Sequence, residues 1–137
     1  MPVIRITSLP LAQDTDIARV LEGFSKEFAE SVALNVDNIY ISWDFLSPGH
    51  YVHQGRAAGL QENETHPIQV ELMTPDIFSA SRLELMMRSI AEAISRRTHV
   101  PRENIFVIHR SLASGRVFDQ GRVQYWAGND DNGNEQI

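Results

Sequence analysis

The sequence predicts an α+β domain made of two fused β-α-β units that share a four-stranded mixed sheet, with both helices on one face. An internal repeat is the first observation, since residues 38–56 and 104–122 are identical at seven of nineteen positions without a gap. The second is an apolar stripe of helical spacing before each of these segments. The third is a short strand before each stripe. All three recur at the same offset of 66 residues, which predicts a duplicated unit.

Two helices are predicted from the apolar stripes, whose members recur at spacings of 3, 1, 3 and 4. The first stripe matches the second residue by residue: Ile17, Val20, Leu21, Phe24 and Phe28 against Leu83, Met86, Met87, Ile90 and Ile94. Asp14 and Thr15 mark the start of the first helix. Ser81 and Glu84 have the spacing of a capping box and mark the start of the second.

Short strands are expected at residues 3–7 and 68–73. In the first, Ile4 and Ile6 fall on one face while Arg5 falls on the other, because side chains alternate along a strand. Arg5 corresponds to Glu71 in the repeat, and the two are expected to pair across the sheet.

Longer strands are expected after the helices, at residues 38–46 and 104–112. A turn at Pro48-Gly49 and one at Ser114-Gly115 then lead into short hairpin runs, 51–53 and 117–119. Polar, turn-rich residues 57–66 join the repeats.

These features predict one domain over residues 1–127, with pseudo-repeats at 2–56 and 67–122. Residues 128–137 are too polar to pack and are expected to form a disordered tail.

With both helices on one face, the other face of the sheet is left uncovered, although the strands carry apolar residues on both sides. A bare apolar face is expected to be covered by further copies of the chain. Seven apolar strand residues are not expected to fit all together beneath the two helices: Val3, Val70, Leu72, Ile39, Ile41, Ile105 and Val107.

Composition excludes several classes of function. The net charge of −6 and the pI near 5.3 disfavour nucleic-acid binding, which needs a basic surface. The chain has no cysteine, and its histidines lack the spacing of a metal site, so no metal or cofactor is expected. No apolar run reaches the ~20 residues that cross a membrane, and no secretory signal is visible. A cytoplasmic protein is therefore expected.

The Met-Pro start followed at once by a strand, the glycine-containing hairpin and the fused repeat resemble the tautomerase superfamily. Residues 37–55 are similar to 4-oxalocrotonate tautomerase, and residues 120–126 to the last strand of malonate semialdehyde decarboxylase. The two-unit form is also similar to macrophage migration inhibitory factor. This resemblance implies a homotrimer whose sheets enclose a barrel. It also implies a small-molecule site at each N-terminal proline, completed by residues 104–112 of a neighbour.

Pro2 is the main catalytic candidate. Once Met1 is removed, its nitrogen is a secondary amine rather than an amide. Burial against apolar walls disfavours the cation and lowers the pKa of such an amine, which makes it a base near neutral pH. It can then move a proton between carbon and oxygen in a small 2-oxo acid or aryl pyruvate.

Partner groups are predicted from the strands. Arg110 is the candidate cation for a carboxylate or an enolate, or else a surface arginine paired with an acid. Tyr40 is the candidate hydrogen-bond donor. Phe106 and Ile108 stand where the resemblance places polar groups and give a more apolar pocket. Trp126 either walls that pocket or packs between subunits.

The arginines that the relatives use are replaced here, at Ala12, Tyr40, Pro75 and Ile77. These departures disfavour a dicarboxylate substrate and acid decarboxylation. They also keep open a non-enzymatic homotrimer with a degenerate site. A monomeric ferredoxin-like binding domain has the same element order and is the third possibility.

Overall fold

A computed structural model describes residues 1–127 of the chain; the predicted tail, 128–137, lies outside the described residues. Four strands form one sheet in the order β2-β1-β5-β6. β1 and β2 are parallel, β5 and β6 are parallel, and β1 and β5 are antiparallel at the centre. The four are β1 (Val3–Ser8), β2 (Tyr40–Phe45), β5 (Ile68–Pro75) and β6 (Ile105–Leu112).

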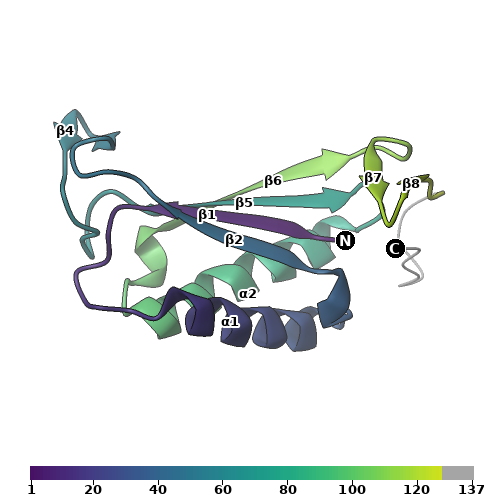
Figure 1. The fold of residues 1–137 in the computed structure, drawn as a ribbon, viewed down its shortest axis with the longest axis horizontal. Helices are drawn as coiled ribbons and strands as arrows, with labels where there is room; N and C mark the ends of the chain where they lie inside the picture. The colour runs from purple at the N-terminus through teal and green to yellow at the C-terminus, as the bar shows by residue number, and fades with distance from the viewer. Residues whose placement is uncertain (128–137) are drawn as a thin grey trace.

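Both helices lie on one face of this sheet, as Figure 1 shows, and the predicted two-layer α+β fold is confirmed. α1 spans Ile17–Val32 and α2 spans Ala80–Thr98. The two long strands begin later than predicted, because a 3₁₀ turn precedes each of them. These turns are η1 (Val36–Asn38) and η2 (Arg102–Asn104).

The predicted helix starts were misplaced by about two residues. Asp16 caps α1 through its side chain, which accepts from the backbone N–H of Arg19. Ser79 caps α2 in the same way, so Ser81 lies inside the first turn instead of capping it. The predicted capping box is therefore wrong, and Glu84 binds Arg88 four residues along instead.

A small hairpin closes each repeat: β3 and β4 (Val52–His53, Arg56–Ala57) in the first, β7 and β8 (Val117–Asp119, Arg122–Gln124) in the second. Both hairpins turn through the same dipeptide, Gln54-Gly55 and Gln120-Gly121. All four of these residues have φ between 53° and 79°. Two successive positive φ angles are typical of the tight hairpin turn whose twist matches the strands. The turn therefore explains why this dipeptide recurs in both repeats.

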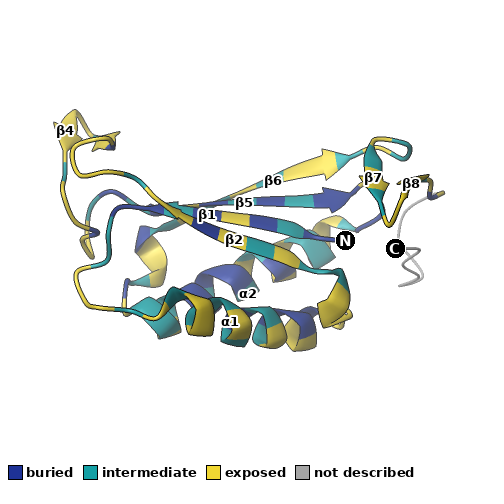
Figure 2. Ribbon diagram, viewed as in Figure 1, coloured by how far each residue is buried: buried dark blue, intermediate teal, exposed yellow. Residues whose placement is uncertain are grey.

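The core lies between the sheet and the helices, where Figure 2 shows the buried sheet residues. Ile4 and Ile6 are fully buried there, as the alternation in β1 predicted. Phe24 and Phe28 of α1 meet edge to face, with ring centroids 6.3 Å apart.

The open face of the sheet carries fewer apolar side chains than expected. Val70 and Leu72 are buried beneath the helices, and Ile39, Ile41, Ile105 and Val107 pack against the same core. The prediction was wrong for these six, since register places Ile41 beside Ile4 and Val107 beside Val70. Exposed apolar side chains on the open face are instead those of Tyr40, Phe106 and Ile108.

Candidate active site

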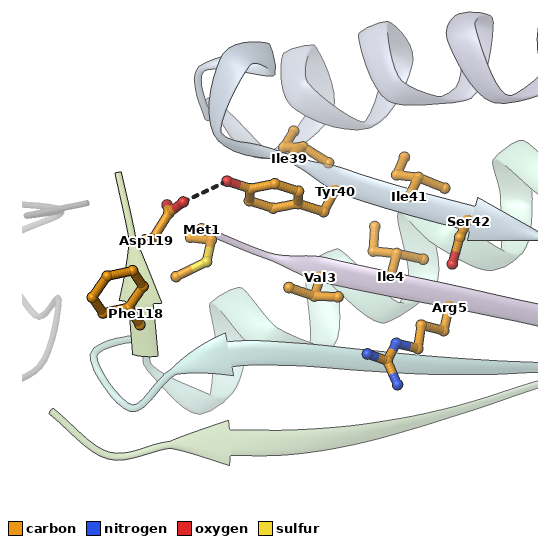
Figure 3. Close-up of a pocket in the computed structure, with 10 residues that line it drawn as sticks. All are labelled: Met1, Val3, Ile4, Arg5, Ile39, Tyr40, Ile41, Ser42, Phe118 and Asp119. Atoms are coloured by element: carbon orange, nitrogen blue, oxygen red, sulfur yellow. Dashed lines mark hydrogen bonds between the residues drawn. The ribbon is translucent and has the colours of Figure 1, made fainter. Parts of the chain in front are cut away.

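A pocket of about 670 Å³ lies at the N-terminal end of β1, between β1, β2 and β7 (Figure 3). Its volume is in the range of small-molecule sites. Two repeats build it, because β1 and β2 belong to the first and β7 to the second. Its lining residues are Met1, Val3, Ile4, Arg5, Ile39, Tyr40, Ile41, Ser42, Phe118 and Asp119.

Pro2 follows Met1 and is buried, and it is not among the residues that line the pocket. Its carbonyl accepts from the backbone N–H of Tyr40 at 3.0 Å, so the sheet fixes its position. Met1 is itself only 7% exposed and forms part of the pocket wall. While Met1 is attached, the nitrogen of Pro2 is an amide and has no basic lone pair. Removal of Met1 would convert this nitrogen into a secondary amine.

Tyr40 and Asp119 meet across the pocket. The hydroxyl of Tyr40 donates to Oδ1 of Asp119 at 2.9 Å, and the backbone N–H of Gln120 donates to the same oxygen at 3.0 Å. The hydrogen bond to this carboxylate raises the pKa of Tyr40 above its usual value of 10.0, and desolvation and the negative charge of Asp119 add to the effect. Tyr40 is neutral at physiological pH, as an ordinary tyrosine is, and the contact with Asp119 keeps it neutral to a higher pH.

Asp119→Asn is expected to lower the pKa of Tyr40 toward its ordinary value. The change removes a charged acceptor, and with it the interactions that favour the neutral phenol. Ultraviolet titration between pH 8 and 12 measures the ionisation, and the difference from Tyr40→Phe assigns it among the three tyrosines. An identical titration of Tyr40 in both forms would contradict the contact with Asp119.

Arg110 lies on the open face but is engaged by an acid. Its Nε lies 3.1 Å from Oε2 of Glu71. The pair expected between Glu71 and Arg5 does not form, although these two residues are opposite each other in the register of β1 and β5. Within residues 1–127, no carboxylate forms an ion pair with Arg5, whose side chain lines the pocket.

Phe106 and Ile108 are 54% and 37% exposed and do not line the pocket of their own chain. They border a second hollow of about 310 Å³ on the open face, together with Glu71, Gln69 and Arg5, which lines both hollows. Arg110, Phe106 and Ile108 are thus on one strand, β6, which β5 separates from β1.

Trp126 packs within its own chain. It is 8% exposed, and its indole N–H donates to Oδ1 of Asp76 at 2.7 Å. Its backbone N–H donates to Oγ of Ser114, which ties the end of the second hairpin to the turn before it. It is not among the residues that line the pocket.

Within residues 1–127, no three His, Asp or Glu side chains are gathered closely enough to hold a metal ion. None of the helices in this part of the chain is long and apolar enough to span a bilayer.

Several solved structures share this architecture. Pt0534 inactivated by 2-oxo-3-pentynoate superposes with a TM-score of 0.76 at 12% identity, over 89% of this chain and 94% of that one. An asymmetric trimer of fused 4-OT superposes with a TM-score of 0.74 at 10% identity, over 88% and 94%. The chain has the fold of the tautomerase superfamily. N1, a member of the cis-3-chloroacrylic acid dehalogenase family, also matches, with a TM-score of 0.66 at 16% identity, over 89% and 82%.

No protein-family model matches the sequence, and no curated protein matches it in sequence. The likeness to the tautomerase superfamily is therefore one of fold, and it confirms the resemblance drawn from the Met-Pro start and the repeat.

Tyr40 is the one predicted site residue among the ten that line this pocket, and Asp119 and Phe118 are the lining residues that lie farthest from it in sequence. They belong to the second hairpin, 79 residues from Tyr40 along the chain in the case of Asp119. The internal repeat could have indicated this contact, because the hairpin of each repeat lies against the beginning of the other repeat. Tyr51 of the first hairpin donates to the carbonyl of Pro67, just before β5, as Asp119 of the second binds Tyr40 beside Pro2.

Proposed function

We propose that this chain is a cofactor-independent tautomerase or isomerase, in which Pro2 moves a proton between carbon and oxygen of a small 2-oxo acid or aryl pyruvate. The observation that supports the proposal is the pocket lined by Met1 and Val3, the two residues on either side of Pro2 in the chain. Met1 fills part of that wall, so its removal both frees the amine and enlarges the space for a substrate.

In the proposed reaction, the neutral amine of Pro2 takes a proton from the carbon beside the substrate carbonyl. Negative charge then develops on the carbonyl oxygen, where a donor stabilises it. Tyr40 is the proposed donor. Its hydroxyl has one proton, so it must turn from Asp119 toward the substrate as the charge develops. The protonated amine returns its proton to the oxygen, which yields the enol and restores Pro2.

The proposed assembly is a homotrimer in which the open faces of the sheets meet. Exposed Phe106 and Ile108 support this, because an exposed apolar patch is stabilised by burial. We propose that these two residues, with Arg110, complete the pocket of a neighbouring copy. Sedimentation equilibrium tests this assembly: the mass of three chains is expected, and the mass of one chain would contradict it.

A non-enzymatic homotrimer is the second candidate function. The ion pair of Arg110 with Glu71 favours it, because that cation is already neutralised. Turnover of enol phenylpyruvate by the chain without Met1 decides between the two. Turnover that Pro2→Ala abolishes supports the enzyme, and its absence supports the alternative.

A further inference from the structure

We propose that Arg5 binds the carboxylate of the substrate and that Asp119 restricts the pocket to substrates with a single carboxylate. This inference rests on the proposed function, because it names the substrate class of the same site. Neither residue was assigned a role in the pocket from the sequence.

Arg5 has the position and the freedom for this role. Its side chain lines the pocket, and it is the one cationic side chain among the ten residues of the lining. Figure 3 shows its guanidinium extending from β1 toward the end of the strand where Met1 lies. Glu71 stands opposite Arg5 in the register, yet its carboxylate binds Nε of Arg110 at 3.1 Å. Glu71 thus leaves Arg5 available to an anion.

A guanidinium is well suited to a carboxylate, since two parallel N–H groups can donate to its two oxygens. With the carboxylate at Arg5, the oxo carbon beside it lies farther along the pocket toward Pro2 and Tyr40. The remainder of the substrate then meets Ile39 and Phe118, which form apolar wall. This order of groups is that of an aryl or alkyl pyruvate.

Asp119 makes the other end of the pocket negative. It is the one acidic side chain in the lining, and Figure 3 places it beside Met1 and Phe118, on the far side of the pocket from Arg5. Hydrogen bonds from Tyr40 and from the backbone of Gln120 hold its carboxylate in place. A second carboxylate on the substrate would lie near this charge, and two like charges repel each other.

The experiment compares three enol substrates on the chain without Met1: phenylpyruvate with one carboxylate, its methyl ester with none, and oxaloacetate with two. Arg5→Gln is expected to raise KM for phenylpyruvate about 10- to 100-fold, the range of a hydrogen bond to a charged group. KM for the ester is expected to stay within about 2-fold, because the ester offers no charge to the guanidinium.

Two further variants sharpen the result. Arg5→Lys keeps the charge but loses the paired donors, so an intermediate KM is expected. Arg88→Gln removes an exposed arginine of α2 whose partner is Glu84, and it is the matched control with no expected effect on KM. Thermal melting of each variant shows that it is folded.

Asp119→Asn tests the second half of the inference. The ratio of kcat/KM for oxaloacetate to that for phenylpyruvate is expected to rise about 10-fold, as like-charge repulsion is removed. The ratio is the informative quantity, because the weaker hydrogen bond between Tyr40 and the uncharged Asn affects both substrates. An unchanged ratio would overturn the role of Asp119.

An equal change of KM for phenylpyruvate and for its ester in Arg5→Gln, or no change in either, would overturn the role of Arg5. If the chain without Met1 shows no turnover, the proposed function fails but the inference is still tested. Calorimetric titration with phenylpyruvate then gives the Kd directly. A Kd that rises in Arg5→Gln and not in Arg88→Gln would support Arg5 as the residue that binds the carboxylate. An unchanged Kd in Arg5→Gln would contradict that role.

Discussion

Pro2→Ala, made in the chain that has lost Met1, is expected to lower kcat/KM for enol phenylpyruvate by about 10²- to 10⁴-fold, the usual contribution of a positioned general base. The alanine amine remains at the N-terminus, but it lacks the ring that fixes the direction of the proline lone pair. The carbonyl of residue 2 can still accept from Tyr40, so the strand is expected to keep its register.

Two comparisons isolate the amine in this experiment. A chain that retains Met1 has the same pocket residues and an acylated Pro2, so it is expected to show no turnover above that of Pro2→Ala. Pro48→Ala replaces a proline in the exposed turn before the first small hairpin, and it is expected to leave kcat/KM unchanged. Full activity in the chain that keeps Met1 would exclude Pro2 as the base.

Phe28→Ala is expected to cause the largest loss of stability, about 3–5 kcal/mol, because it leaves a cavity at a fully buried position. It also removes the edge-to-face contact with Phe24. A domain of this kind is stable by only ~5–15 kcal/mol, so a large part of the folding free energy is lost. Urea unfolding at one fixed chain concentration measures the change, since assembly makes stability depend on concentration.

Leu85→Ala is the matched control for this loss. Leu85 lies on α2 and is 39% exposed, so its truncation creates no enclosed cavity. Its effect is expected to stay below about 1 kcal/mol, near the range of surface substitutions. Equal losses for the two variants would contradict the placement of the core between α1 and the sheet.

The fold was predictable because the same pattern of strands and helix occurs twice along the chain. A helical stripe at Ile17 and a second at Leu83, with strands at the same offset, leave few arrangements for two β-α-β units. The alternation in β1 also placed Ile4 and Ile6 together on one face, which is the face buried in the core. What failed was the assignment of faces in the neighbouring strands. That assignment depends on register, and register sets Ile41 beside Ile4.

The candidate site was predictable only in part. Tyr40, predicted from its place on the second strand, lines the pocket, whereas the role of Pro2 stays a prediction. Asp119 was missed, because its contact with Tyr40 depends on how the second hairpin folds back over the first repeat. Both Arg5 and Arg110 lie near Glu71 in the sheet, so the sequence did not determine which arginine forms the ion pair with it.

The most direct test of Pro2 as the catalytic base combines the intact mass of the protein isolated from its own cells with enol phenylpyruvate turnover on the same sample. The expected result is a chain that lacks Met1 and shows turnover that Pro2→Ala abolishes. A chain that retains Met1, or one that lacks it and shows turnover unaffected by Pro2→Ala, would contradict the assignment.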